Sequence, residues 1–210
     1  MNKVRLENFS DGVFAIAVTL LILSVRLPDA KNYDNNELNY ALRKAIPHLV
    51  TFAFSFMVIG VFWVAHHRIF ALARVVNNTL LWLNILYLLF IAIMPYPAAL
   101  VAENPFLSTG ILVYTSTLFI IGSLHFVLLN YIIQNRHIKH EALTKEVYRS
   151  YQRTAAVGPV CYVLAALGSF ISPYISFCFI LGALIFYIFF SGKGKIEEKL
   201  MIVAKQEVTK

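Results

Sequence analysis

A single carboxylate, Asp11, stands at the edge of a long apolar segment in this chain. The residues that follow it, 12–25, are apolar except for Thr19 and Ser24. An ionisable group in a membrane-spanning helix is costly unless it faces protein or water and has a partner. Asp11 therefore marks a candidate functional site, and its partners must come from other segments that reach the same depth.

Other polar side chains are expected at that depth. If successive helices cross a membrane in alternating directions, the start of the first, the end of the second and the start of the third meet at one surface. These three ends carry Arg5, Ser10, Asp11, His66, His67, Arg68, Asn78, Trp82 and Asn84. We expect Asp11 to pair with His66, His67 or Arg68, and the sequence does not choose among them.

Three kinds of chemistry fit this group. The side chains can form a structural polar clamp that holds three helices together. A carboxylate beside histidines can also relay protons or sense pH, since the unperturbed pKa of His is about 6.5. A membrane enzyme that uses Asp and His is the third interpretation. No phosphate-binding loop, nucleophile elbow or cofactor motif occurs, and Cys161 and Cys178 lack metal-site spacing, so we expect no cofactor and no metal site.

The same helix carries an apolar stripe. At 100° per residue its members fall within about 40° of one line; they are Phe9, Ile16, Leu20, Leu23 and Leu27. Thr19 lies beside the stripe. Such a stripe can face lipid, pack in a core, or form a hydrophobic constriction in a pore. The residue pattern leaves these three alternatives open.

The composition of the chain indicates the class of protein in which these residues lie. Hydrophobic types make up 59% of the 210 residues and charged types 14%, whereas a soluble domain is about one quarter charged. No Asp, Glu, Lys or Arg occurs within 45–67, 75–102, 104–135 or 154–192. About 20 apolar residues cross a bilayer core of roughly 30 Å. The chain is therefore expected to be an all-α, multi-pass membrane protein, and disorder and nucleic-acid binding are excluded.

Six transmembrane helices are expected within one domain, residues 1–192, followed by a basic tail over 193–210. The spans lie at about 9–27, 47–70, 79–101, 106–133, 155–171 and 173–190. Pro95 and Pro97 should kink or end the third span. Residues 29–44 are expected to form a polar loop, and 134–152 to continue the fourth helix or form a loop. His125 and Asn130 are expected to form interhelical hydrogen bonds, with a proton path as the alternative.

The Lys and Arg residues indicate the orientation. With six spans both termini share one side, and that side holds fourteen of the eighteen basic residues. The excess places the N- and C-termini in the cytoplasm and the chain in the cell membrane. A secretory signal peptide is the competing interpretation of the first span. Glu7 and Asp11 fall where a signal is basic, and no small-residue cleavage site follows, so we reject it.

A motif at the first helix resembles a known family. Residues 5–11 read RLENFSD, an RxxxFSD motif that opens the first span. Trp63-x-x-His66-His67-x-x-Phe70, Leu83-Asn84 and Pro95 follow in the next two spans. These features resemble the transmembrane-protein-175 family, which includes lysosomal potassium channels of animals and single-repeat bacterial relatives. The similarity covers the first three helices well and the last three only by number and length.

The resemblance implies a potassium-permeable channel. Family members lack the TVGYG filter, as does this chain, and line their pore with the first helix of each repeat. One repeat implies a homotetramer. By position, the resemblance implies a constriction at Ile16, Leu20 and Leu23, with Thr19 at the ion path. It also implies a polar network formed by Ser10, Asp11, His66 or His67, and Trp82. Arg5 and Phe9 of the motif are grouped with this network.

Two expectations about function follow. A narrow apolar ring that strips part of the hydration shell should favour potassium over sodium weakly to moderately, because potassium is more weakly hydrated. The competing hypothesis is a proton-coupled secondary transporter that uses Asp11 and the histidines, although no internal repeat of the kind common in transporters is found.

Overall fold

The chain folds into a bundle of α-helices. The computed structural model describes residues 2–25, 34–139 and 145–189. Its elements are α1 (Lys3–Leu20), the 3-10 turn η1 (Leu21–Ser24), α2 (Asn35–Ala71), α3 (Asn78–Ile93), α4 (Pro95–Glu103), α5 (Ser108–Gln134), α6 (Lys145–Gly168) and α7 (Pro173–Phe189). No strand occurs in these ranges. The all-α prediction is confirmed, and residues 193–210 of the predicted tail lie outside the described part.

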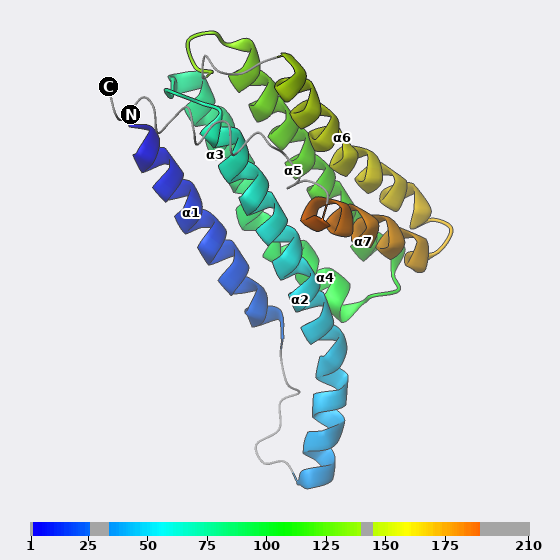
Figure 1. The fold of residues 1–210 in the computed structure, drawn as a ribbon. Coiled ribbons are helices and arrows are strands. Elements are labelled where there is room, and N and C mark those ends of the chain that lie inside the picture. Colours follow the sequence, from blue (N-terminus) through cyan, green and yellow to red (C-terminus); the bar gives the residue numbers. More distant parts are fainter. Residues whose placement is uncertain (1, 26–33, 140–144, 190–210) are drawn as a thin grey trace.

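Within the described ranges, four helical segments are long and apolar enough to cross a membrane. They are α1 with η1, α2, α3 with α4, and α5, whereas α7 is a shorter apolar helix. In Figure 1, α1 lies beside α2 and α3, and the pair α6 and α7 lies at the opposite side of the bundle. Helix α5 packs against α3 and α6, so it joins these two parts.

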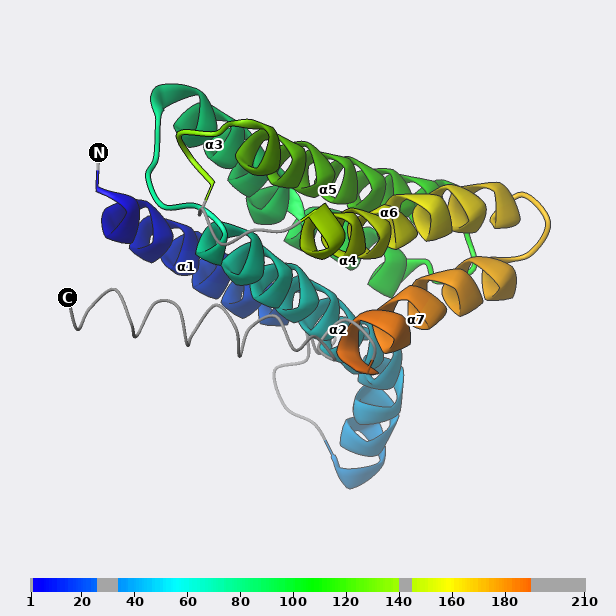
Figure 2. The same ribbon diagram turned by 45° about the horizontal axis from the view of Figure 1, so that its top comes forward.

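Helix α2 begins about three turns before the predicted second span. Asp34 and Glu37 form a capping box, in which the Glu37 amide donates to Asp34 Oδ1 at 2.7 Å and the Asp34 amide donates to Glu37 Oε2 at 3.2 Å. The helix then continues through Pro47 for 37 residues, or about 55 Å. Residues 35–44 are thus helical, contrary to the predicted loop, and this end of α2 projects beyond the other helices (Figures 1 and 2).

The third span breaks where its prolines predict. Helix α3 ends at Ile93, and α4 starts at Pro95 after Met94. Proline at the first position of a helix costs no hydrogen bond, because the first amides of a helix have no partner within it. The prediction for 134–152 was less accurate, since α5 ends at Gln134 and the segment from Lys145 belongs to α6.

The loops at one end of the bundle are tied together. The Arg74 amide donates to the Ile138 carbonyl at 2.7 Å, and Ala73 and Lys139 form an isolated antiparallel bridge. These contacts join the connection between α2 and α3 to the residues that follow α5. They fix the end of the bundle at which the polar side chains of α1, α2 and α3 meet.

Candidate functional site

Helix α1 presents one packed face and one open face. Leu6, Phe14, Ala17 and Leu21 are buried against the bundle. The predicted apolar stripe lies on the open face, with exposed fractions of 61% for Ile16, 42% for Leu20 and 63% for Leu23; Phe9 is exposed there too. Leu27 lies outside the described residues. Among the described residues of one chain, the stripe is therefore a continuous apolar surface that is not covered by another helix.

Thr19 is exposed beside the stripe. Its hydroxyl donates to the carbonyl oxygens of Ala15, at 3.0 Å, and Ile16, at 2.9 Å. These bonds within the helix satisfy the donor without another helix. The lone pairs of the Thr19 oxygen remain available on the same open side of α1.

A buried chain of hydrogen bonds joins α1, α3 and α2. The Ser10 hydroxyl donates to the Leu6 carbonyl and accepts from Asn84 Nδ2, both at 2.9 Å. His66 Nε2 lies 2.7 Å from Asn84 Oδ1. Because an amide oxygen only accepts, His66 donates from Nε2. Ser10, His66 and Asn84 are all buried, so these bonds form away from solvent, where an unpaired polar group is costly.

Aromatic rings enclose this chain of bonds. The His66 ring stacks on Phe70, with centroids 4.4 Å apart, and on Tyr87, with centroids 5.5 Å apart. The Tyr87 and His125 rings lie 6.1 Å apart. The sequence prediction missed Tyr87, although its position one turn after Asn84 on α3 places the two on the same face.

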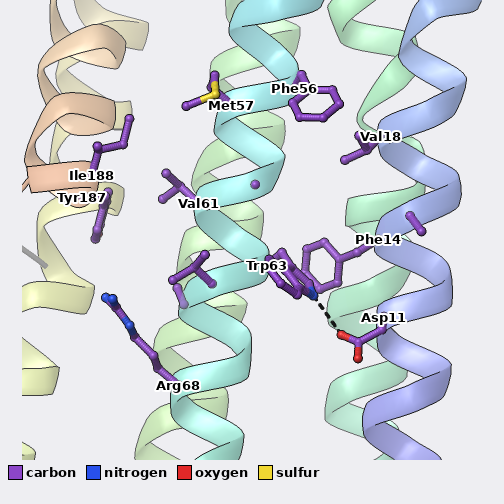
Figure 3. A pocket seen from close by; sticks show the side chains of 14 residues that line it. Asp11, Phe14, Val18, Phe56, Met57, Val61, Trp63, Arg68, Tyr187 and Ile188 are labelled. Atoms are coloured by element: carbon purple, nitrogen blue, oxygen red, sulfur yellow. Dashed lines mark hydrogen bonds between the residues drawn. The ribbon is translucent and has the colours of Figure 1, made fainter. Parts of the chain in front are cut away.

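Asp11 points away from the buried chain, toward a different partner. Trp63 Nε1 on α2 donates to Asp11 Oδ1 at 2.8 Å (Figure 3). This bond differs from the predictions, in which Asp11 pairs with His66, His67 or Arg68 and Trp82 supplies the indole of the network. The Trp82 side chain is 62% exposed on α3. Trp63 comes one turn before His66 in the motif, which is the signal that could have identified it.

The remaining predicted residues are less central. His67 is exposed beside the Trp63 ring, with centroids 6.4 Å apart, and Arg5 and Asn78 are exposed near the start of their helices. Among the two candidates on α5, Asn130 accepts a hydrogen bond from Gln152 of α6. His125 is buried, and neither its Nδ1 nor the Tyr87 hydroxyl has a hydrogen-bond partner among the described residues. Cys161 and Cys178 are free thiols.

An open groove of about 770 Å³ runs between α1, α2 and α7. Asp11, Trp63 and Arg68 lie toward one of its ends (Figure 3). Gly60 also belongs to its lining. On α1 its lining residues Ala15 and Val18 lie beside the stripe rather than on it. The groove and the stripe are therefore neighbouring open surfaces of the same helix.

Comparisons with known proteins show the family to which this chain belongs. Residues 5–95 match the family model for the endosomal/lysosomal potassium channel TMEM175. A potassium channel of Chamaesiphon minutus is 35% identical over 190 residues, which cover 84% of this chain and 90% of that protein. The chain belongs to the TMEM175 family.

Two further TMEM175 comparisons agree. The crystal structure of a lysosomal potassium-selective channel TMEM175 homologue from Chamaesiphon minutus superposes with a TM-score of 0.79 at 30% identity, over 90% of this chain and 98% of that one. The endosomal/lysosomal proton channel TMEM175 of Bos taurus is 39% identical over 45% of this chain and 21% of its own length. The predicted resemblance is confirmed, and membership makes the chain a multi-pass membrane protein of a channel family and not an enzyme.

Proposed function

We propose that this potassium channel is a homotetramer in the cell membrane, with α1 of each copy lining a central pore. The observation that carries the proposal is the exposed stripe of Ile16, Leu20 and Leu23 on a helix whose other face is buried. One copy presents this surface on only one side. Four copies around an axis would bring the stripes together and enclose a path.

An apolar ring accounts for the expected selectivity. The stripe offers no fixed set of oxygen ligands that could replace the hydration shell of an ion. A narrow apolar constriction acts by partial dehydration and can close by dewetting. Potassium loses water more readily than sodium, so we expect weak to moderate preference for potassium. The exposed Thr19 oxygen is the nearest polar atom to this ring and is proposed to contact the ion in transit.

The polar side chains that bond α1 to α2 and α3 are proposed to fix the direction in which the apolar stripe of α1 faces. Ser10 ties α1 to α3 through Asn84, and Asn84 ties both to His66 on α2. Asp11 adds a second bond to α2 through Trp63. Two bonds on different flanks of α1 restrain its rotation about its own axis. Restraint of this kind favours the clamp over a catalytic role for Asp11.

The groove beside the stripe is proposed to receive the adjacent copy. In a fourfold ring, each α1 faces the axis with one surface and a neighbour with the next. Ala15 and Val18, which line the groove, lie on one side of Ile16 around α1 and so occupy that second surface. The Lys and Arg distribution further supports cytoplasmic termini for every copy.

Substitution of the constriction tests this function. Purified Ile16→Asn protein, checked for tetrameric size, is recorded in a planar bilayer with potassium on one side and sodium on the other. We expect a larger conductance and a reversal potential shifted toward zero, because the amide widens and wets the ring. The matched control is Ile22→Asn, an exposed isoleucine on a different face of the same segment. Unchanged current and reversal potential in Ile16→Asn would remove Ile16 from the constriction.

Proton permeation is a second candidate function. It is favoured by the buried His66 that is joined through Asn84 to Ser10, next to Asp11, and by the proton channel named among the animal relatives. A reversal potential that follows a pH gradient in symmetric potassium would support it. Saturable flux with fixed ion stoichiometry and no unitary currents would instead support a proton-coupled transporter and overturn the channel proposal.

A further inference from the structure

The turn between α6 and α7 ends in apolar side chains that the bundle does not cover. Phe170 and Ile171 are 72% and 80% exposed, more than any other large apolar side chain in the described residues. Next to them lie Phe106, Leu107 and Tyr174, which are also exposed, and the Phe106 and Tyr174 rings are 5.9 Å apart. We call these five residues the tip patch.

Hydrogen bonds fix the level of the tip patch relative to α5. The Ser108 hydroxyl donates to the Ser169 carbonyl at 2.8 Å, so the start of α5 and the turn lie at one level. Near the other end of the hairpin, Gln152 donates to Asn130. The two bonds bound a segment of α6 in which residues 154–168 carry no charged side chain.

The charge-free end of α6 is short for a membrane span. From Arg153 to Gly168, the last residue of α6, the helix rises about 23 Å at 1.5 Å per residue. The hydrocarbon core of a bilayer is about 30 Å thick. If the exposed, charged Arg153 stays at one membrane surface, the tip patch falls several ångströms short of the opposite edge of the core.

We propose that the tip patch is immersed in lipid and is covered by the acyl chains and headgroup boundary of the leaflet that it faces. Tyr174 favours this depth, because the amphipathic ring of tyrosine suits the membrane–water interface. No charged residue lies within 104–135 or 154–192 to pull the tip into water. A hydrophobic segment shorter than the bilayer is accommodated by local thinning around it.

The position of the turn favours lipid, rather than a second copy of the chain, as the material that covers the tip patch. In both views the turn between α6 and α7 lies at the far side of the bundle from α1 (Figures 1 and 2). Copies arranged around α1 would place this turn at the outer rim of the assembly. Lipid is the medium at that rim. This step rests on the proposed arrangement of copies around α1 and is independent of what passes through the pore.

Site-directed fluorescence quenching tests the proposal. In full-length protein with Cys161→Ala and Cys178→Ala, Ile171→Cys is labelled with bimane and reconstituted into phosphatidylcholine vesicles. The matched control is Asn104→Cys, an exposed polar position just before α5. For Ile171→Cys, we expect quenching by a lipid nitroxide near the headgroup to exceed quenching by aqueous iodide by at least about twofold, with the reverse order for Asn104→Cys.

Each other outcome would overturn the proposal. Stronger quenching by iodide at position 171 would place the tip in water. Protection from both quenchers would mean that another protein surface covers it. Phe170→Cys is measured in parallel, so that failure of one variant to fold does not remove the test, and both variants are first checked for a native elution volume.

Discussion

Trp63 donates the hydrogen of its indole nitrogen to Asp11 Oδ1 across 2.8 Å, and this bond joins the motif aspartate on α1 to the last third of α2. Ser10, the preceding residue, turns to the other flank and bonds Asn84. Successive helical residues point about 100° apart. The adjacent Ser and Asp of the motif therefore hold α1 from two directions at one level.

Loss of the indole donor should weaken this hold. Trp63→Phe keeps an aromatic ring but leaves Asp11 without the indole hydrogen bond, and we expect a destabilisation of about 1–2 kcal/mol, the upper range for an interhelical bond in a membrane protein. The measurement is the midpoint of thermal unfolding in detergent, followed by far-ultraviolet circular dichroism. Trp82→Phe is the matched control, since that indole is exposed. Equal midpoints for the two variants would contradict the assignment of Trp63.

Asn84 should matter more, because it bonds two buried groups. Asn84→Ala leaves the His66 Nε2 hydrogen unpaired and removes the bond that Ser10 accepts, although Ser10 still donates to the Leu6 carbonyl. The expected cost is about 2–3 kcal/mol. Tyr87→Phe, one turn away, removes a buried hydroxyl that has no hydrogen-bond partner among the described residues. We expect that control to leave stability unchanged or raise it. If Tyr87→Phe lowered the free energy of unfolding more than Asn84→Ala did, the buried chain of hydrogen bonds would not be the clamp.

Thr19 should affect conduction and leave folding unchanged. Thr19→Val keeps the branched shape and removes only the oxygen, so the expected result is a lower unitary potassium conductance with an unchanged melting temperature. The comparison is Thr115→Val on α5, where a buried hydroxyl also bonds a carbonyl of its own helix, that of Ile111, at 2.8 Å. The measurement is the unitary potassium conductance of both variants in single-channel recordings. Identical conductances would exclude the Thr19 oxygen from the ion path.

Packing between α6 and α7 depends on a glycine. The Gly158 amide donates to the Tyr187 hydroxyl at 2.8 Å, and a Cβ on Gly158 would lie 2.9 Å from that oxygen. Gly158→Ala should therefore displace Tyr187, break this bond and lower the thermal midpoint. Gly182→Ala provides the contrast, because a Cβ there meets no atom within 4 Å and alanine gains about 0.5–1 kcal/mol over glycine within a helix. Similar midpoints for both variants would argue against this close contact.

The ends of the helices show which structural features the sequence pattern predicts and which it does not. Pro95 correctly marked the break between α3 and α4, because proline acts locally on its own backbone. The predicted second span begins at Pro47, whereas the helix that contains this residue begins about three turns earlier. The Asp34 and Glu37 capping box sets that helix start, and its spacing was readable from the sequence. Proline inside a helix is tolerated where the remaining backbone bonds and packing compensate, which a local pattern does not reveal.

The sequence by itself determined the membrane class, the apolar stripe on α1 and the motif that carries the family resemblance, because these depend on composition and on the regular period of a helix. It also placed Ser10, Asp11, His66 and Asn84 at one depth, since depth follows from counting residues along each span. Only the tertiary structure decided that Trp63 bonds Asp11 and that His66 bonds Asn84. Which side chains of equal depth meet depends on the rotation of each helix about its axis, and packing against its neighbours sets that rotation.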